Sequence, residues 1–174
     1  RGRIKDMKWS DEELIYEAPH ETYRTTRHHY GNRIVFDKKG YLYFSIGDRG
    51  AQDQAQDPTR PNGKIHRIFP DGSIPDDNPY ADQGLPTLYT LGNRNPQGIS
   101  VHPLTDEIWS IEHGPLGGDE LNLIQKGKNY GWPVISYGKN YNGTIITEYT
   151  RKEGYEQPIL YWKPSIAVCG MEFY

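Results

Sequence analysis

Hydrophobic and polar residues alternate in short segments along much of the chain, and helical periodicity is scarce. Strict alternation over about four to eight residues is typical of a strand that buries one face. Turn-forming pairs such as Lys39-Gly40 and Gly117-Gly118 separate the segments. The pattern therefore predicts an all-β protein. The expected strands are Glu13–Ala18, Arg33–Phe36, Tyr41–Ile46, Lys64–Ile68, Thr87–Leu91, Ile99–Val101, Glu107–Ile111, Leu121–Ile124, Val134–Tyr137 and Pro158–Trp162.

One part of this pattern occurs twice. Residues 34–46 (IVFDKKGYLYFSI) align without gaps on residues 99–111 (ISVHPLTDEIWSI), and both stretches end in aromatic-Ser-Ile. In each copy an expected third strand and an expected fourth strand follow in the same order. Four-stranded units at this spacing are typical of β-propeller blades. A β-sandwich with a chance resemblance between two hairpins is the alternative.

The blades define the expected domain organisation, a single partial β-propeller domain over residues 1–174. It holds about three four-stranded blades, half of a six-bladed propeller. Propellers normally close with about four to eight blades, so three would leave two open edges prone to pairing. The approximate limits are a partial blade at 1–32, blades at 33–92 and 98–138, and a second partial blade at 158–174.

The composition and charge of the chain exclude several functional classes of protein. The net charge is −3, with no basic stripe, so nucleic-acid binding receives no support. The single cysteine, Cys169, excludes an internal disulfide and a cysteine-based zinc site. No apolar run approaches the roughly 18 residues of a membrane span, so we expect no membrane insertion. No signal peptide is visible, although the chain begins with Arg1 rather than Met, which leaves room for an upstream segment.

Several long stretches then carry a resemblance to a known family, in collinear order from about Arg24 to Tyr174. They resemble the glucose/sorbosone dehydrogenases, soluble sugar dehydrogenases that use pyrroloquinoline quinone (PQQ), and especially the bacterial aldose sugar dehydrogenases. The stretches are HHYGNRIVFDKKGYLYFSIGDRG, GKIHRIFPDGSIPDDNPY, LGNRNPQGISVHP, EIWSIEHGPLGGDELNLIQKGKNYGWPVISYG and QPILYWKPSIAVCGMEFY.

The resemblance implies a six-bladed β-propeller that oxidises aldose sugars to lactones, with PQQ and Ca²⁺ as cofactors and a periplasmic or secreted location. Family members are about twice as long as this chain. The part that supplies a lysine and arginines to the quinone in the family is absent here. Whether the chain is an enzyme is therefore left open.

The resemblance assigns catalytic roles to His29 and Asp48. His29 would be the general base that takes the sugar hydroxyl proton, a role that suits imidazole because its pKa lies near neutrality. Asp48 would orient His29 and raise its basicity. The alternatives for His29 are a surface-loop histidine and a structural histidine hydrogen-bonded near the sheet. The alternative for Asp48 is an aspartate that closes a Gly-Asp turn. His28 is expected to be structural, because adjacent side chains on an extended chain face opposite sides.

The stretch NRNPQG supplies the next two candidates. By resemblance, Arg94 lies against the quinone and stabilises negative charge, a task suited to a fixed guanidinium. Asn95 would hold a cofactor oxygen. The alternative is an arginine that forms an ion pair in a loop, followed by Asn-Pro turn chemistry.

The crowded segment IEHGPLGGDELNLI is assigned to calcium by the same resemblance. The main-chain carbonyls of Gly114 and Pro115 would ligate the Ca²⁺ that binds PQQ. Glu120 and the carbonyl of Tyr130 would contribute to a second, structural Ca²⁺. Oxygen-only ligation fits a hard cation. The alternative is a surface turn with a solvated Glu120. The aromatic residues Tyr130, Trp132 and Tyr137 are expected to fill blade cores, with a sugar-stacking platform as the alternative.

Two functions therefore remain in view. The first is an aldose dehydrogenase in which His29 removes the proton of the anomeric hydroxyl and Arg94 and Ca²⁺ stabilise the reduced cofactor. The second is a catalytically incomplete half-propeller that pairs as a homodimer, closes a six-bladed ring by two-fold symmetry and has a binding or structural role.

Overall fold

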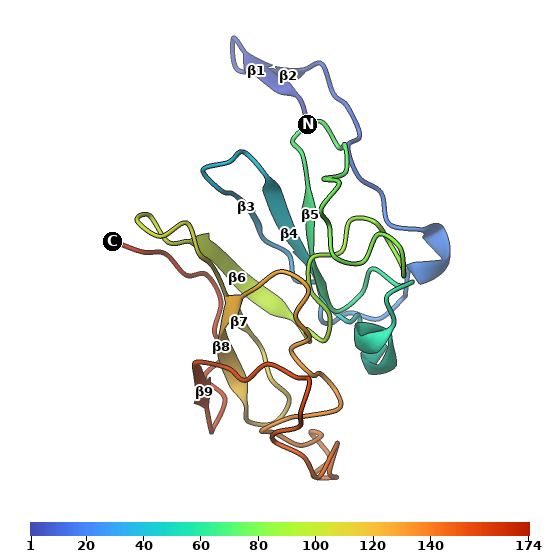
Figure 1. The fold of residues 1–174 in the computed structure, drawn as a ribbon, viewed down its shortest axis with the longest axis vertical. Coiled ribbons are helices and arrows are strands. Elements are labelled where there is room, and N and C mark those ends of the chain that lie inside the picture. The colour runs from blue at the N-terminus through green and yellow to red at the C-terminus, as the bar shows by residue number, and fades with distance from the viewer.

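The computed structural model describes all 174 residues as antiparallel β-structure with two short 3-10 helices (Figure 1). The all-β prediction is confirmed. The elements are β1 (Arg3–Lys5), β2 (Lys8–Ser10), η1 (His20–Thr22), β3 (Ile34–Phe36), β4 (Leu42–Ile46), η2 (Gln52–Gln56), β5 (Lys64–Ile68), β6 (Pro96–Val101), β7 (Ile108–Glu112), β8 (Asp119–Ile124) and β9 (Leu160–Trp162).

The strands form three sheets in which sequence neighbours pair. The orders are β1-β2, β3-β4-β5 and β6-β7-β8-β9. In the two larger sheets the register places Ser45 opposite Ile65 and Ser110 opposite Asn122. Figure 1 shows these two sheets beside one another, with the β1-β2 hairpin standing off at one end. Meandering antiparallel sheets of this kind are what a propeller blade requires.

The two expected fourth strands are wrong. Residues 87–91 form only two isolated bridges, an antiparallel one between His66 and Leu88 and a parallel one between Leu91 and Asn129. Residues 134–137 form no strand, because the amides around them are bonded elsewhere: Trp132 N–H donates to the Gly92 carbonyl and Ser136 N–H to the Tyr149 carbonyl.

The second sheet takes its fourth strand from further along the chain. Leu160–Trp162 pairs with β8, and Glu120 lies opposite Tyr161. Residues 158–162 were expected to start the next blade, and the structure instead adds them to the blade that β6 begins.

The N-terminal part of the chain also differs from expectation. No strand forms over residues 13–18, although Ile15 and Tyr16 pack on the first large sheet. The hairpin of β1 and β2 was not predicted, because each strand has three residues and all six are exposed. An exposed strand of that length leaves no alternation of buried and exposed positions for the sequence to display.

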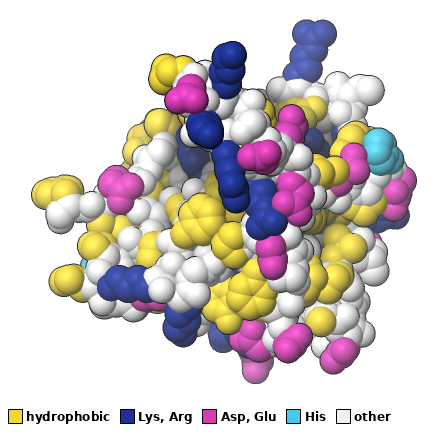
Figure 2. All heavy atoms as spheres, turned by 90° about the horizontal axis from the view of Figure 1, so that it is seen from above, with side chains coloured by type: hydrophobic (Ala, Val, Ile, Leu, Met, Phe, Trp, Pro, Cys, Tyr) yellow, Lys and Arg dark blue, Asp and Glu magenta, His cyan; other side chains and the backbone are white.

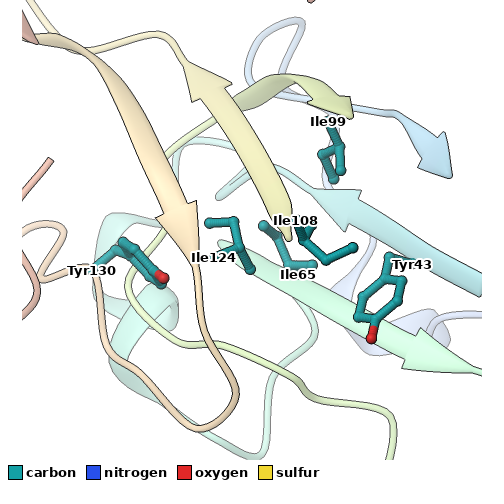
Figure 3. Close-up of a cluster of buried hydrophobic side chains, with 6 residues drawn as sticks. All are labelled: Tyr43, Ile65, Ile99, Ile108, Ile124 and Tyr130. Carbon is teal, nitrogen blue, oxygen red and sulfur yellow. The ribbon is translucent and has the colours of Figure 1, made fainter. Parts of the chain in front are cut away.

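The main core lies between the two large sheets (Figure 3). Tyr43 and Ile65 come from the first sheet, and Ile99, Ile108 and Ile124 come from the second, with Tyr130 packed beside them. Ile65 is fully buried. Burial of such a side chain stabilises the fold by roughly 1.5–3 kcal/mol. This core fixes the position of one blade against the next.

Strand β4 is buried on both faces. Tyr43 faces the second sheet, whereas Leu42, Phe44 and Ile46 form a second cluster on the opposite face. Ile15 and Tyr16 cover part of that cluster. The N-terminal segment therefore shields the face of the first sheet that points away from the second.

The surface is mixed in charge and partly apolar. In Figure 2 acidic and basic side chains are interspersed with exposed hydrophobic atoms on the face that is drawn. On β3 only Val35 is partly buried, and its neighbours Ile34 and Phe36 are more than half exposed. No helix in the structure has the length and apolar character needed to cross a bilayer.

Candidate active site

The predicted site residues gather where strands end and loops begin. Asp48 follows β4 after one residue, and the loop that starts at His113 follows β7 directly. The His113 N–H donates to the carbonyl of Asn95, which lies just before β6. A cavity of about 670 Å³ opens between these segments. Five of the predicted residues line it, namely His29, Asp48, Arg94, Asn95 and Pro115.

His29 and Asp48 form a close pair. The Nδ1 atom of His29 lies 2.6 Å from Oδ1 of Asp48. The carboxylate is 1% exposed and the imidazole 17%. An ionised carboxylate accepts only, so Nδ1 carries the hydrogen and Nε2 keeps its lone pair. Nε2 makes no hydrogen bond in the structure, which leaves it available as a base.

Asp48 is held in its ionised form. Burial alone would raise the pKa of this carboxyl, but the hydrogen bond from His29 and its charge lower it more, together with donors from Gly50 and Trp132. The Gly50 N–H donates to Oδ1 at 2.8 Å, and the Trp132 indole donates to Oδ2 at 2.8 Å. The pKa of Asp48 therefore lies below its ordinary value, as an orienting carboxylate requires.

His28 does not lie as the sequence led us to expect. Its ring centroid is 4.6 Å from that of His29, and both residues line the cavity. The physical reason is the backbone of His29, which has a φ of 60° and is not extended. The rule that neighbours face opposite sides applies to extended chain and fails in this left-handed conformation.

Arg94 is buried with spare donors. It is 5% exposed, and its Nη1 donates to the His113 carbonyl at 2.8 Å. Its Nε is buried without a partner. The guanidinium carbon lies 5.2 Å from the centroid of the Trp132 ring. No carboxylate neutralises this side chain directly, so it can serve an anionic oxygen in the cavity.

A buried carboxylate that the sequence analysis missed supports Arg94 and Asn95. Both backbone amides donate to Oε2 of Glu112, at 2.6 and 3.1 Å. Asn93 Nδ2 donates to Oε1 at 3.2 Å. Burial raises the pKa of Glu112, and these donors oppose the rise. The signal in the sequence was an acidic residue directly after the aromatic-Ser-Ile end of a repeat.

The segment 113–119 is a loop closed by Asp119. Its Oδ1 accepts from the Gly114 N–H at 2.9 Å, and its Oδ2 accepts from the amides of Ile166 and Ala167. A Cβ atom on Gly114 would lie 2.1 Å from the Gly118 carbonyl oxygen, so only glycine fits there. The loop is tightly built and is not a solvated surface turn.

A second, much smaller cavity adjoins the first. Its volume of about 10 Å³ is close to that of one water-sized sphere. All four residues assigned to calcium line it, namely Gly114, Pro115, Glu120 and Tyr130.

The residues in and next to this small cavity offer several oxygen atoms as possible metal ligands, and one of these oxygens has no hydrogen-bond partner. Asn122 donates to Glu112 Oε1 and Glu120 Oε2, both at 3.2 Å, and its own Oδ1 is buried without a partner. Burial and the neighbouring Glu112 raise the pKa of Glu120. Two close carboxyls and an orphaned carbonyl oxygen fit a hard divalent cation.

Trp132, which was expected to fill a blade core, is buried and in addition links site residues. Its indole hydrogen bond to Asp48 joins positions 84 residues apart in the sequence. Only the packing of the two blades brings these residues together, and no local sequence pattern signals it.

The fold and the site define a β-propeller protein with an imidazole–carboxylate pair in a cavity beside the ends of its strands. The family model for Glucose / Sorbosone dehydrogenase matches residues 1–174, and the chain belongs to that family. The resemblance and the β-propeller fold class expected from the sequence are both confirmed.

Comparisons with individual proteins agree with this family assignment. Aldose sugar dehydrogenase YliI of Escherichia coli (strain K12) is 46% identical over 179 residues, which cover 99% of this chain and 48% of that protein. The apo structure of the soluble aldose sugar dehydrogenase from Escherichia coli matches with a TM-score of 0.91 at 40% identity, covering 97% of this chain and 50% of its own. The PQQ-bound aldose sugar dehydrogenase of Streptomyces coelicolor matches with a TM-score of 0.70 at 29% identity, covering 90% and 41%. The chain thus spans about half the length of the relatives it matches.

Proposed function

We propose that this chain supplies the base and part of the cofactor site of a PQQ- and Ca²⁺-dependent aldose dehydrogenase. The observation that carries the proposal is the pair of partly buried His29 and buried Asp48, which opens on the same cavity as Arg94 and Asn95. One side of that cavity thus offers a proton acceptor, and another offers a fixed positive charge. Oxidation of an alcohol carbon by hydride removal needs both.

His29 takes the proton in this proposal. Its Nε2 accepts the hydrogen of the sugar's anomeric hydroxyl, and the charge that forms on the ring is stabilised by Asp48 at 2.6 Å. The ionised state of Asp48, favoured by three hydrogen-bond donors, keeps His29 in the tautomer that this step requires. Bound PQQ would supply the hydride acceptor, and the sugar would leave as a lactone.

The residues present also suit the cofactor's charge. Arg94 has a buried Nε without a partner, and Asn95 lines the cavity beside it, so both can hold anionic or carbonyl oxygens. The carbonyls of Gly114 and Pro115 would hold the Ca²⁺ of the cofactor, and Glu120 and the Tyr130 carbonyl a structural ion. The two carboxyls that line the small cavity, Glu112 and Glu120, support a cation site there.

Reconstitution tests the proposal. The intact protein is mixed with PQQ and Ca²⁺, and reduction of a redox dye is followed with several aldoses. Turnover is expected, and His29→Asn should reduce it by on the order of 100-fold or more. His20→Asn is the matched control, because that side chain is 80% exposed and lies outside the cavity. Absence of turnover, together with no change in the PQQ absorbance, would reject the proposal.

A second candidate is a homodimer that closes a six-bladed ring and has a binding or structural role. Exposed apolar side chains on the outer strands favour it: Ile34 and Phe36 on β3, and Leu160 and Tyr161 on β9. Apolar strand faces of this kind are prone to pairing. Small-angle scattering is expected to give the mass of a dimer, and a well-folded monomer would contradict it.

For the location, we propose the periplasm or secretion, on the family resemblance. Cell fractionation followed by immunodetection tests this, and recovery in the cytoplasmic fraction alone would contradict it.

A further inference from the structure

Trp132 contacts both halves of the proposed site. Its indole Nε1 donates to Asp48 Oδ2 at 2.8 Å, and its ring lies 5.2 Å from the guanidinium carbon of Arg94. Asp48 belongs to the loop after β4 of the first blade, whereas Arg94 precedes the second blade. One aromatic side chain therefore touches the partner of the base and the fixed positive charge.

The hydrogen bond to Asp48 is the sole one that Oδ2 accepts. Oδ1 already serves His29 and the Gly50 amide. With Oδ2 fixed as well, the carboxylate plane cannot rotate away from the imidazole. An indole N–H only donates, so it bonds the ionised carboxylate and disfavours a proton on Oδ2. Trp132 thus helps both to orient Asp48 and to keep it charged.

The contact with Arg94 constrains the guanidinium. That side chain makes one hydrogen bond, from Nη1 to the His113 carbonyl, and its Nε is unpaired. A cation over an indole face is attracted to it, more so when both are shielded from water. Arg94 is 5% exposed and Trp132 8%. The ring therefore restricts a guanidinium that a single hydrogen bond would leave free to turn.

Trp132 is itself held on both sides of its backbone. Its N–H donates to the Gly92 carbonyl at 2.9 Å, and its carbonyl accepts from Gln56 Nε2 at 2.7 Å. Gln56 is the last residue of η2, in the same loop as Asp48. Trp132 is therefore held by two backbone hydrogen bonds in addition to the one that its indole donates to Asp48.

We propose that Trp132 is a positioning residue that sets the orientation and charge of Asp48, and thereby the tautomer of His29, while it restricts Arg94. This inference rests on the proposed function for its effect on turnover, but not for its effect on the His29–Asp48 pair. The pair exists in the protein without cofactor or sugar, so it can be observed separately.

The first test is spectroscopic. In the intact protein without PQQ, the His29 Nδ1 proton, bonded to Asp48, should give a low-field proton NMR signal. Trp132→Phe keeps a ring but removes the N–H, and the signal should broaden or shift markedly. Trp109→Phe is the control, because that indole N–H is buried without a partner, and it should leave the signal unchanged. An unchanged signal in Trp132→Phe, or an equal change in both variants, would overturn the proposal.

The second test is kinetic. With PQQ and Ca²⁺ present, Trp132→Phe should lower kcat by on the order of 10- to 100-fold through misorientation, with the apparent pKa of the acid limb of the pH profile displaced. KM should change little, because Trp132 acts through Asp48 and Arg94. If the wild type shows no turnover, the proposed function fails while the NMR test still decides this inference. Loss of affinity alone, with kcat intact, would overturn it.

A replacement closer in shape to tryptophan tests whether the effects of Trp132→Phe come from a change of fold. Trp132 can be replaced by benzothienylalanine, which substitutes sulfur for the N–H with almost no change of shape. The low-field signal and kcat should fall as in Trp132→Phe, while thermal unfolding matches the wild type. Retention of both by this variant would show that the N–H has no positioning role.

Discussion

The side-chain amides of Gln56 and Asn129 form a reciprocal pair across the two blades. Asn129 Nδ2 donates to Gln56 Oε1 at 2.8 Å, and Gln56 Nε2 donates to Asn129 Oδ1 at 3.1 Å. The same Nε2 also bonds the Trp132 carbonyl. The loop after β4 is thus fastened to the segment that follows β8, next to the residues that form the proposed site.

Removal of that fastening should lower stability. Gln56→Ala leaves the Asn129 amide and the Trp132 carbonyl without their partners, so the free energy of unfolding should fall by about 1–3 kcal/mol. Urea unfolding measures it. Gln125→Ala is the control, since that side chain is exposed and makes no hydrogen bond, and should be neutral. Equal effects from both variants would show that the amide pair contributes nothing.

The core between the sheets should be sensitive to truncation. Ile65 is fully buried among residues of both blades, so Ile65→Ala should cost about 2–5 kcal/mol through lost burial and a residual cavity. Ile145→Ala, at a position 62% exposed, should cost little. Denaturant melts of the two variants provide the comparison, and a loss below about 1 kcal/mol for Ile65→Ala would contradict this packing.

His66 should make the fold sensitive to acid. Complete burial, between Phe44 and Tyr16, lowers its pKa from 6.5 to about 3. The unfolded chain binds a proton below about pH 6.5 and the folded chain does not, so stability should fall by about 1.4 kcal/mol for each pH unit below that point. Above pH 6.5 this residue should have no effect.

The variant His66→Asn separates this contribution from the others. It should be less stable at neutral pH, because it loses hydrogen bonds to Thr87 and to the Pro61 carbonyl. Its unfolding free energy should nevertheless depend less steeply on pH between 6.0 and 4.5 than that of the wild type. His20→Asn, at an exposed site, should keep the wild-type slope. Identical slopes in wild type and His66→Asn would refute the assignment.

Calcium should stabilise the protein through Glu120. At a concentration about 100 times its dissociation constant, a ligand of the folded state adds about 2.7 kcal/mol. Glu120→Gln should lose most of the rise in Tm that Ca²⁺ gives to the wild type, because one of the two carboxyls beside the small cavity becomes neutral.

Calorimetry with Ca²⁺ and with a chelator measures that rise. The matched control is Glu153→Gln, a substitution at an exposed position that should respond to Ca²⁺ as the wild type does. A full calcium response in Glu120→Gln would place the ion elsewhere.

Much of this fold could be predicted, because strands such as Leu42–Ile46 and Ile108–Glu112 are rich in apolar and aromatic residues and share the aromatic-Ser-Ile motif of the repeat. The fourth strands could not. Residues 134–137 have the composition of a strand, but the amide of Ser136 within them donates to the Tyr149 carbonyl, and Leu160–Trp162 pairs with the edge of β8 instead. Which segment occupies a sheet edge depends on tertiary packing, so the local sequence of a candidate strand cannot predict it.

The site likewise has residues that the sequence could predict and residues that it could not. The resemblance pointed to His29, Asp48, Arg94 and Asn95, and the structure brings all four to one cavity. The resemblance gave no indication of Glu112, which accepts hydrogen bonds from the backbone amides of Arg94 and Asn95. It also gave no indication that the Trp132 indole donates to Asp48. Supporting residues of this kind act through distant contacts, and the one sequence signal, an acidic residue directly after the repeat, marks the position of Glu112 but not its role.

The link between Asp48 and Trp132 also has a consequence for the order of folding. Its partners are 84 residues apart, so it can form only after a long loop has closed and both sheets are in place. Contacts of such separation form slowly and tend to come after local hairpins. The hairpins of each blade are therefore expected to precede the site, and substitutions at Trp132 should mainly accelerate unfolding while leaving the folding rate almost unchanged.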